Sequence, residues 1–213
     1  MARGGARPGA GRKRLERYSY VPHRTRAAHS RRHPMHITAR AVRGLPSFRA
    51  QRIASLVLLQ MRRLNDGEFQ IVHFSVQSNH VHLIVEGEDR ETVIRKMSGF
   101  MISFAKRLNR QVLGNRRGKV WRERYYRRDV TSTRDMHNVL TYVFGNAKKH
   151  GEIPRDALYL DASSSAWTFD GWDVKPELPP AWVRWKPPKP RTDLLEGEWV
   201  VHGLLRVSGS PRS

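Results

Sequence analysis

Residues 79–86 have the sequence Asn79-His80-Val81-His82-Leu83-Ile84-Val85-Glu86. Their apolar content and β-branched side chains predict a buried strand. Because side chains alternate between the two faces of a strand, His80 and His82 point to one side and Val81 and Leu83 to the other. Two imidazoles placed in this way can share one divalent ion. The alternative is that one histidine is an ordinary hydrogen-bonded sheet residue and the other occurs by chance. This stretch alone favours that alternative, so a metal site needs support from the rest of the chain.

The excess of positive charge points to a polyanionic partner. The 213 residues carry 40 Lys and Arg against 19 Asp and Glu, a formal net charge of +21. Residues 151–213 hold 8 of the basic and 9 of the acidic side chains, so the whole excess lies in residues 1–150. A region this basic repels itself unless it meets a polyanion. Nucleic acid is the first expectation and an anionic membrane surface the second.

The composition narrows the class of protein. The chain has no cysteine, which removes disulfides, thiolate zinc sites and cysteine nucleophiles and predicts a cytoplasmic protein. Hydrophobic residues make up 38% of the chain, enough for one core. No apolar run approaches the ~20 residues of a membrane span, and the Arg/Gly-rich start does not resemble a secretory signal. We therefore expect no membrane partner.

Three regions differ in composition. Residues 1–33 are rich in Arg, Gly and Ala and predict a flexible basic arm, which either adds phosphate contacts or has no fixed role. Residues 34–151 carry the periodic apolar patterns of a folded domain. Residues 152–213 hold five of the six tryptophans and many prolines. Since disordered tails are usually poor in aromatic residues, we expect this extension to dock on the domain, as core cover or as a flap over a binding site.

The order of predicted elements indicates the fold. The elements are, in chain order, strand 36–42, helix 47–65, strand 68–76, strand 79–86, helix 89–108, strand 120–130 and helix 131–150. This β-α-β-β-α-β order with a following helix predicts an α+β fold, with a ferredoxin-like antiparallel sheet and helices on one face. In that topology the first and third strands are central, so His80 and His82 lie mid-sheet. The other face is expected to be open to nucleic acid.

Aromatic and basic residues interleave in the stretch Val120-Trp121-Arg122-Glu123-Arg124-Tyr125-Tyr126-Arg127-Arg128-Asp129-Val130. Such a strand can stack bases and pair with phosphates, although an ordinary strand with solvated charges is the alternative. We expect DNA contacts from this stretch, from the basic turn before it and from the end of the last helix. The candidate residues are Arg117, Trp121, Arg124, Arg127, Arg128, Lys148 and Lys149.

Tyr142 and Asn146 lie four residues apart on the last predicted helix, so they share one helix face. Both lie at the edge of the apolar stripe rather than within it. Taken alone, a half-buried packing tyrosine and a helix-terminus asparagine are the simpler interpretations. Helical spacing therefore marks the pair as a candidate and does not establish it.

The combination resembles a known superfamily. The histidine motif of the HUH endonucleases, above all of single-tyrosine transposases of the insertion-sequence-200 type, is similar to Gln77-Ser78-Asn79-His80-Val81-His82-Leu83-Ile84-Val85. Within these proteins, Tyr142 with Asn146 resembles the REP-associated tyrosine transposases, in which an Asn stands where other members use Gln. The segment around Trp121 also resembles the family's Trp-containing segment. One departure is Ala147, where the family often has Pro.

The resemblance implies a chemistry for these residues. Tyr142 would attack a DNA phosphodiester, form a 5′-phosphotyrosine bond and release a 3′-hydroxyl, so that the strand can be rejoined to another end. His80, His82 and Asn146 would hold one divalent metal ion, Mg²⁺ or Mn²⁺, against the scissile phosphate. The resemblance covers residues 36–151. Over this range the motifs follow one another in the same order as in the family, without insertions between them.

Other titratable residues are weaker candidates. A phenol is mostly protonated at neutral pH, so the nucleophile needs help from a nearby cation, for which Lys148 and Lys149 are the candidates. Glu86 shares the histidine face, but it lies four residues beyond His82, about 13 Å at ~3.3 Å per residue, too far to join the same ion. His73 on the neighbouring strand is more simply a core histidine.

These observations predict a metal-dependent single-stranded DNA endonuclease and strand transferase, that is, a transposase, with a hairpin or repeat as substrate. Two alternatives stay open: a non-catalytic nucleic-acid binder on the same scaffold, and a relaxase-like nicking enzyme. The set of His80, His82, Tyr142 and Asn146 argues against the binder, and the small size argues against the larger nicking proteins. The sequence is compatible with a monomer or a homodimer.

Overall fold

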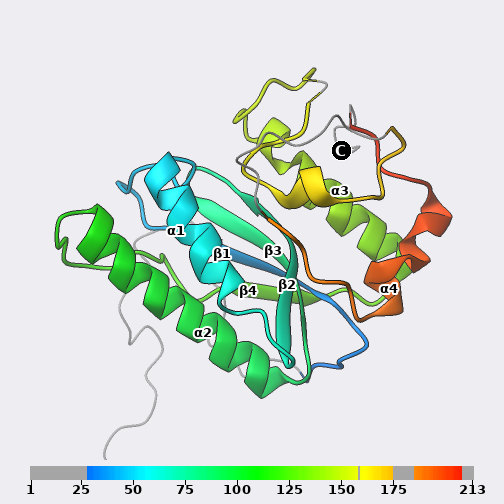
Figure 1. Cartoon of the computed structure of the whole chain (residues 1–213), viewed down its shortest axis with the longest axis horizontal. Coiled ribbons are helices and arrows are strands. Elements are labelled where there is room, and N and C mark those ends of the chain that lie inside the picture. Colours follow the sequence, from blue (N-terminus) through cyan, green and yellow to red (C-terminus); the bar gives the residue numbers. More distant parts are fainter. Residues whose placement is uncertain (1–27, 158, 175–184, 208–213) are drawn as a thin grey trace, which may run out of the picture.

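One antiparallel sheet organises the molecule (Figure 1). The computed structural model describes residues 28–157, 159–174 and 185–207, so the predicted basic arm lies mostly outside the described residues. The four strands are β1 (Met35–Arg40), β2 (Phe69–Val76), β3 (His80–Gly87) and β4 (Tyr126–Asp129), in the spatial order β2-β3-β1-β4. All neighbouring strands pair antiparallel. The predicted ferredoxin-like α+β fold, with the first and third strands central, is confirmed.

Two helices cover one face of the sheet. The helices α1 (Gln51–Arg62) and α2 (Arg90–Arg107) pack on the side of β3 that carries Val81, Leu83 and Val85. Burying each such side chain is worth about 2 kcal/mol, so this layer fixes which way β3 faces and sends its histidines to the opposite side. The helix α2 begins as predicted, with the Asp89 carboxylate accepting from the Thr92 N–H at 2.6 Å. A π-helical turn, η1 (Leu108–Val112), follows it.

The start of α1 differs from the prediction. Ser47 does not cap this helix, because it closes a separate turn in which its Oγ accepts from the Arg49 N–H at 3.2 Å and its C=O from the Ala50 N–H at 3.0 Å. The helix begins at Gln51 after this turn, without a side-chain cap. The extra turn brings Arg49 against β2, where its guanidinium donates to the Val76 C=O at 3.0 Å.

The predicted strand over 120–130 is much shorter than expected. Only Tyr126–Asp129 pairs as β4, and before it a single bridge joins Trp121 to Ala41. The Trp121 ring packs in the core between the sheet and α2, and its Nε1–H donates to the Met101 C=O at 2.8 Å. A large indole gains more from burial in this core than from exposure on a strand, so the chain bends inward here.

The second face of the sheet is covered in part, which corrects the expectation of an open face. The helix α3 (Thr133–Lys149) begins at its N-cap Ser132 and packs against Val72 and Ile84 of the sheet. Segments of the C-terminal extension complete this second core: η2 (Ser165–Thr168), α4 (Asp193–Glu196) and η3 (Glu198–His202). Figure 1 shows α3 and α4 on the side of the molecule away from α2. The described part of the chain contains no helix with the length and apolar content needed to cross a bilayer.

A bulge in β2 changes the facing of its residues. The pairing of β2 with β3 shifts register between Ile71 and His73. As a result Val72 and His73 both face α3, and the residues on either side of them return to the α1–α2 core. His73 is buried between Phe144 and Phe169, with ring centroids 5.4 and 5.2 Å away, which agrees with its interpretation as a core histidine.

Candidate active site

The sheet and α3 bring Tyr142 against the two histidines of β3. The rings of His80 and His82 lie 4.8 Å apart, edge to face, on the sheet face that α3 covers. The Tyr142 ring, half-buried on α3, meets the His82 ring at a centroid distance of 5.3 Å and an angle of 86°. Residues 60 positions apart in the chain are therefore neighbours at this point, because α3 crosses the face on which the alternation of β3 places the imidazoles.

Four buried polar atoms have no partner at this junction. They are the Nε2 atoms of His80 and His82 and both amide atoms of Asn146, for which the described residues provide no hydrogen bond. Asn146 is fully buried, and both histidines are only 2% exposed. Buried polar atoms are rarely left unsatisfied, so these four atoms are available to a ligand.

The opposite nitrogen of each imidazole is occupied. The Nδ1–H of His80 donates to Asn79 Oδ1 at 2.7 Å. The Nδ1 of His82 lies 3.0 Å from His36 Nε2 and 3.1 Å from Thr38 Oγ1. Because each Nδ1 is engaged, Nε2 is the nitrogen that remains available to a ligand, and the ring orientation is fixed.

His36 and Thr38 are the residues that sequence reasoning missed. Both come from β1, whose register sets Thr38 directly opposite His82 and Arg40 opposite His80. The His36 ring also stacks on the His82 ring at 5.2 Å and meets the Tyr142 ring at 5.8 Å. The sequence does place His36 and Thr38 two residues apart on a predicted central strand, as it does His80 and His82. The pairing register of the two strands, which the sequence does not give, is what brings the two pairs together.

Burial keeps the imidazoles uncharged. Desolvation, aided by the charges of Arg40 and His150, lowers the pKa of His80 to about 4, and the nearby Asn146 side chain opposes that shift. Desolvation and the neighbouring His36 and His80 rings hold the pKa of His82 well below its usual value. Both rings are therefore neutral at neutral pH, the form in which an imidazole binds a metal ion.

The donor atoms suit a divalent ion. Two neutral imidazole nitrogens and one amide oxygen, from His80, His82 and Asn146, can serve as ligands and leave positions for phosphate oxygens and water. Among the described residues no three His, Asp or Glu side chains are arranged to hold a metal ion. Glu86 is engaged elsewhere, because its buried carboxylate accepts from the backbone N–H groups of Arg191 and Thr192, both at 2.9 Å.

The two lysines at the end of α3 point in different directions. Lys149 Nζ lies 5.0 Å from the centroid of the Tyr142 ring, within the range of a cation–π contact. Lys148 is buried, and its Nζ donates to the backbone carbonyls of Ala157 and Val207. Of the two cations predicted to assist the phenol and to bind DNA, Lys149 is beside the ring and Lys148 instead holds the extension.

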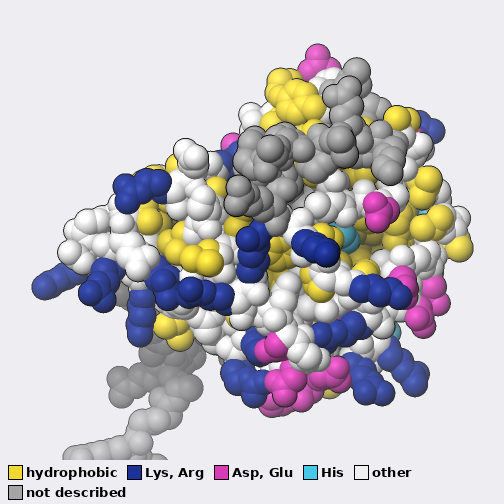
Figure 2. Space-filling model, viewed as in Figure 1, with side chains coloured by type: hydrophobic (Ala, Val, Ile, Leu, Met, Phe, Trp, Pro, Cys, Tyr) yellow, Lys and Arg dark blue, Asp and Glu magenta, His cyan; other side chains and the backbone are white. Residues whose placement is uncertain are grey.

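The other predicted DNA-binding residues are divided between surface and interior. Arg117 is exposed, and Arg128 is exposed on β4 while its guanidinium pairs with both oxygens of Asp135, at 2.7 and 2.8 Å. Arg127 turns inward to Asp129 at 3.2 Å, with 4% of its side chain exposed. Arg124 is half-buried and Trp121 lies in the core, so Trp121 is not in a position to stack on DNA. Figure 2 shows Lys and Arg side chains gathered around the end of α2 that leads into η1.

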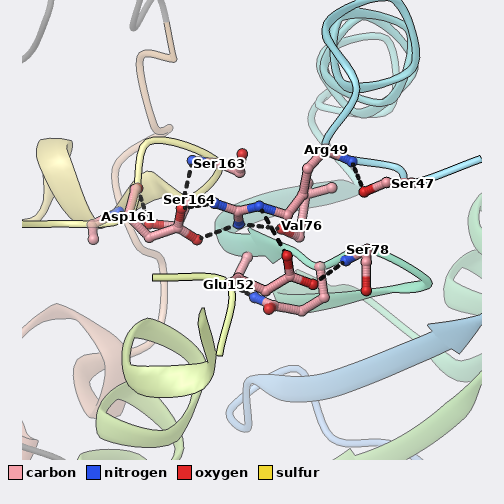
Figure 3. Close-up of polar contacts among 11 residues, drawn as sticks. Ser47, Arg49, Val76, Ser78, Glu152, Asp161, Ser163 and Ser164 are labelled. Carbon is pink, nitrogen blue, oxygen red and sulfur yellow. Dashed lines mark hydrogen bonds and ion pairs between the residues drawn. The ribbon is translucent and has the colours of Figure 1, made fainter. Parts of the chain in front are cut away.

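A polar network holds the turn that precedes His80 (Figure 3). Glu152, just after α3, accepts from the Ser78 N–H at 2.9 Å and lies 3.5 Å from the Arg49 guanidinium. Arg49 in turn pairs with Asp161 of the extension. The turn is thus fixed from the segment before α1, from the end of α3 and from the extension, and Asn79 at its end orients the His80 ring.

Two comparisons with known proteins found matches, one by sequence family and one by fold. Residues 46–146 match the family model described as "Transposase IS200 like", which confirms the resemblance found in the sequence. Among solved structures, a REP-associated tyrosine transposase bound to a REP hairpin superposes with a TM-score of 0.52 at 14% identity, over 68% of this chain and 83% of that chain. At that identity the likeness shows a shared fold. No curated protein matches. The matched segment contains His80, His82, Tyr142 and Asn146.

Proposed function

We propose that this chain, whose residues 46–146 match the IS200-like transposase family, cuts and rejoins single-stranded DNA through a covalent bond to Tyr142. The substrate we propose is a hairpin or repeat exposed as a single strand. The solved relative is described as bound to a REP hairpin, which supports a structured single strand rather than a plain duplex.

The proposed step is a transesterification. The Tyr142 phenol oxygen forms a bond to the scissile phosphorus, and the bond from phosphorus to the 3′-oxygen breaks. The phenol loses its proton, and the departing 3′-oxygen gains one, leaving a 5′-phosphotyrosine and a free 3′-hydroxyl. A 3′-hydroxyl of another strand end reverses the reaction, because the covalent bond conserves the energy of the phosphodiester.

The residues around Tyr142 have separate parts in this step. One divalent ion, Mg²⁺ or Mn²⁺, held by His80, His82 and Asn146, would polarise the phosphate and orient it for in-line attack. Lys149, beside the Tyr142 ring, places positive charge where the phenolate develops. His36 and Thr38 hold the ring of His82 in one orientation.

The observation that carries the proposal is the meeting of Tyr142 with unsatisfied ligand atoms. A phenol ring lies 5.3 Å from the His82 ring, in a region where Nε2 of both histidines and the Asn146 amide lack partners. A protein that only grips nucleic acid needs no such buried, unsatisfied donors, because each costs about 1–3 kcal/mol.

The test is a covalent-adduct assay. The full chain is incubated with Mn²⁺ and a 5′- or 3′-labelled single-stranded hairpin oligonucleotide, and the products are separated on a denaturing gel. We expect a protein–DNA adduct that carries the label only when the label lies 3′ to the cut, together with a free 3′-hydroxyl on the other fragment. The Tyr142→Phe variant keeps the ring and should form no adduct.

Two results would redirect the proposal. An adduct that persists in Tyr142→Phe would move the nucleophile to another residue, with Tyr126 as the exposed candidate. Tight binding of the hairpin without any adduct, with Mg²⁺ and with Mn²⁺, would leave a non-catalytic DNA binder on the same scaffold. Exposed Tyr159→Phe serves as the matched control, since it removes a phenol hydroxyl outside the site.

A further inference from the structure

A groove extends from Tyr142 along the side of the molecule. It has a volume of about 1010 Å³ and is formed by β1 and β4, by α3 and by residues 202–206 of the extension. His36 and Tyr142 are part of its lining. The groove is therefore continuous with the candidate active site, and two of its walls, β1 and the extension, lie outside the family match at 46–146.

Two large apolar side chains in this groove face solvent. Tyr126 of β4 is 48% exposed and Leu204 of the extension is 45% exposed, and both line the groove. Apolar surface that remains exposed in a concave site usually marks a binding surface. An aromatic ring on a sheet is also the common platform for a nucleobase, and one stacked base contributes enough to change affinity several-fold or more.

The charge of the groove suits a polyanion. Arg128, Arg134 and Arg206 line it, and none of its described lining residues is acidic. Outside the groove, Arg128 pairs with Asp135 at 2.7 Å and the exposed Arg206 lies 3.9 Å from Asp173. Arg134 is exposed and makes no ion pair with the described residues. A second cavity, of about 550 Å³, mixes Arg31, Arg32 and Arg191 with four carboxylates, from Glu86, Glu88, Asp193 and Glu198, which would repel phosphate. Of these two cavities, the groove beside Tyr142 is the one that combines an exposed aromatic ring with an arginine, Arg134, that has no ion pair among the described residues.

We propose that this groove binds the unpaired nucleotide next to the scissile phosphate, with its base packed against Tyr126 and Leu204 and its backbone phosphate held by Arg134 and Arg206. The inference rests on the proposed function for the position of the scissile phosphate at Tyr142. It gives the extension a part in DNA binding, because Leu204 and Arg206 supply one side of the site.

The test separates base contacts from phosphate contacts. The full-length Tyr142→Phe protein, which binds without cutting, is titrated with oligo(dT) and with an abasic oligomer of the same length, which keeps the phosphates. Tyr126→Ala, made in this background, should raise the Kd for oligo(dT) about tenfold and leave the Kd for the abasic oligomer unchanged. Leu204→Ala should act in the same direction with a smaller effect, and Tyr126→Phe should retain tight binding.

The arginines should behave differently from the apolar pair. Arg134→Gln should weaken both probes by the same factor and reduce the salt dependence of binding, since it removes a phosphate contact. The control variants are Val201→Ala, 76% exposed on the same segment but outside the groove, and Arg63→Gln at the end of α1. Val201→Ala should leave the ratio of the two Kd values unchanged, and Arg63→Gln should leave both Kd values and their salt dependence unchanged.

The outcomes also separate this inference from the proposed function. The ratio compared is the Kd for oligo(dT) divided by the Kd for the abasic oligomer. If Tyr126→Ala and Leu204→Ala both leave this ratio as it is in the Tyr142→Phe protein, the groove does not bind a base, whatever the adduct assay shows. If this ratio rises as expected while the unmutated chain forms no covalent adduct, the groove binds DNA and the proposed chemistry is wrong. Leu204 lies on the surface, so Leu204→Ala decides the matter even where Tyr126→Ala does not fold.

Discussion

The guanidinium of Arg49 and the carboxylate of Asp161, 112 residues apart in the chain, form a two-point ion pair with N–O distances of 3.0 and 2.8 Å. The Asp161 side chain is fully buried in this pair, and 18% of the Arg49 side chain is exposed. Arg49 also reaches the Val76 C=O at the end of β2. The pair thus ties the extension to the turn that carries Asn79 and His80.

Loss of this carboxylate should destabilise the whole domain. Asp161→Ala is expected to lower the free energy of unfolding by about 3 kcal/mol, because it leaves the partly buried guanidinium without its partner. Urea denaturation followed by circular dichroism measures the change. Asp170→Ala removes an exposed aspartate of the same segment and should stay within about 0.5 kcal/mol of the unmutated protein. An equal decrease in the free energy of unfolding in the two variants would show that the Arg49–Asp161 ion pair does not stabilise the domain.

The His36 ring should control metal affinity through His82. His36→Phe keeps a ring against His82 and Tyr142 but removes the Nε2 atom that lies 3.0 Å from His82 Nδ1. Since partners of metal-binding imidazoles typically account for 10–100-fold in affinity, we expect the Kd for Mn²⁺ to rise about tenfold. Titration followed by electron paramagnetic resonance measures free Mn²⁺ without any turnover. His33→Ala, a histidine outside the site, is the control, and an unchanged Mn²⁺ affinity in His36→Phe would contradict the expectation.

Acid should weaken the fold through His73. Burial lowers the pKa of His73 from 6.5 to about 3, so below pH 6.5 the unfolded chain takes up a proton that the folded chain does not. Stability contributed in this way is complete above pH 6.5 and falls as the pH drops toward 3, by about 1.4 kcal/mol per pH unit. His73→Leu should therefore lose about 2 kcal/mol less than the unmutated protein between pH 7 and pH 5 in urea denaturation. Parallel pH profiles for the two proteins would exclude this role.

The Glu86 carboxylate should hold the extension in place. It accepts hydrogen bonds from the Arg191 N–H, from Thr192 and from Gln70, and it is 2% exposed. Glu86→Gln replaces one accepting oxygen with a donor, so we expect local opening to become easier by about 1.5 kcal/mol, or roughly tenfold. Limited trypsin digestion at the Arg191–Thr192 bond measures this opening. The exposed neighbour Glu88 provides the control, and Glu88→Gln should be cut at the original rate.

The sequence predicted the parts of the site that local periodicity determines. The alternation along residues 79–86 placed His80 and His82 on one face, and the helical spacing placed Tyr142 and Asn146 on one face of a helix. That the helix meets the histidines was implied by the family resemblance and not by the spacing. The central place of β3 followed from the order of elements. These features depend on short stretches of chain, whose pattern survives in any context.

What could not be predicted depends on contacts between distant segments. The bulge at Val72 and His73 turns two neighbouring residues to one face, which no strict alternation allows. The basic neighbours of Trp121 suggested that its ring stacks on DNA, but the ring is packed in the core between the sheet and α2. The pairing of β1 with β3 brought His36 and Thr38 to His82, because register is set by the packed sheet and not by either strand alone.

The helix that carries Tyr142 has a consequence for protein synthesis. Its buried side is completed by Leu160, Phe169, Trp172, Leu194 and Trp199, all of which follow it in the chain. A nascent chain that has emerged only as far as Lys149 already contains every proposed catalytic side chain but lacks the partners that hold α3 in place. We therefore expect the ability to cut DNA to arise only after those later residues have left the ribosome, so that a partly translated molecule stays harmless to the genome beside it.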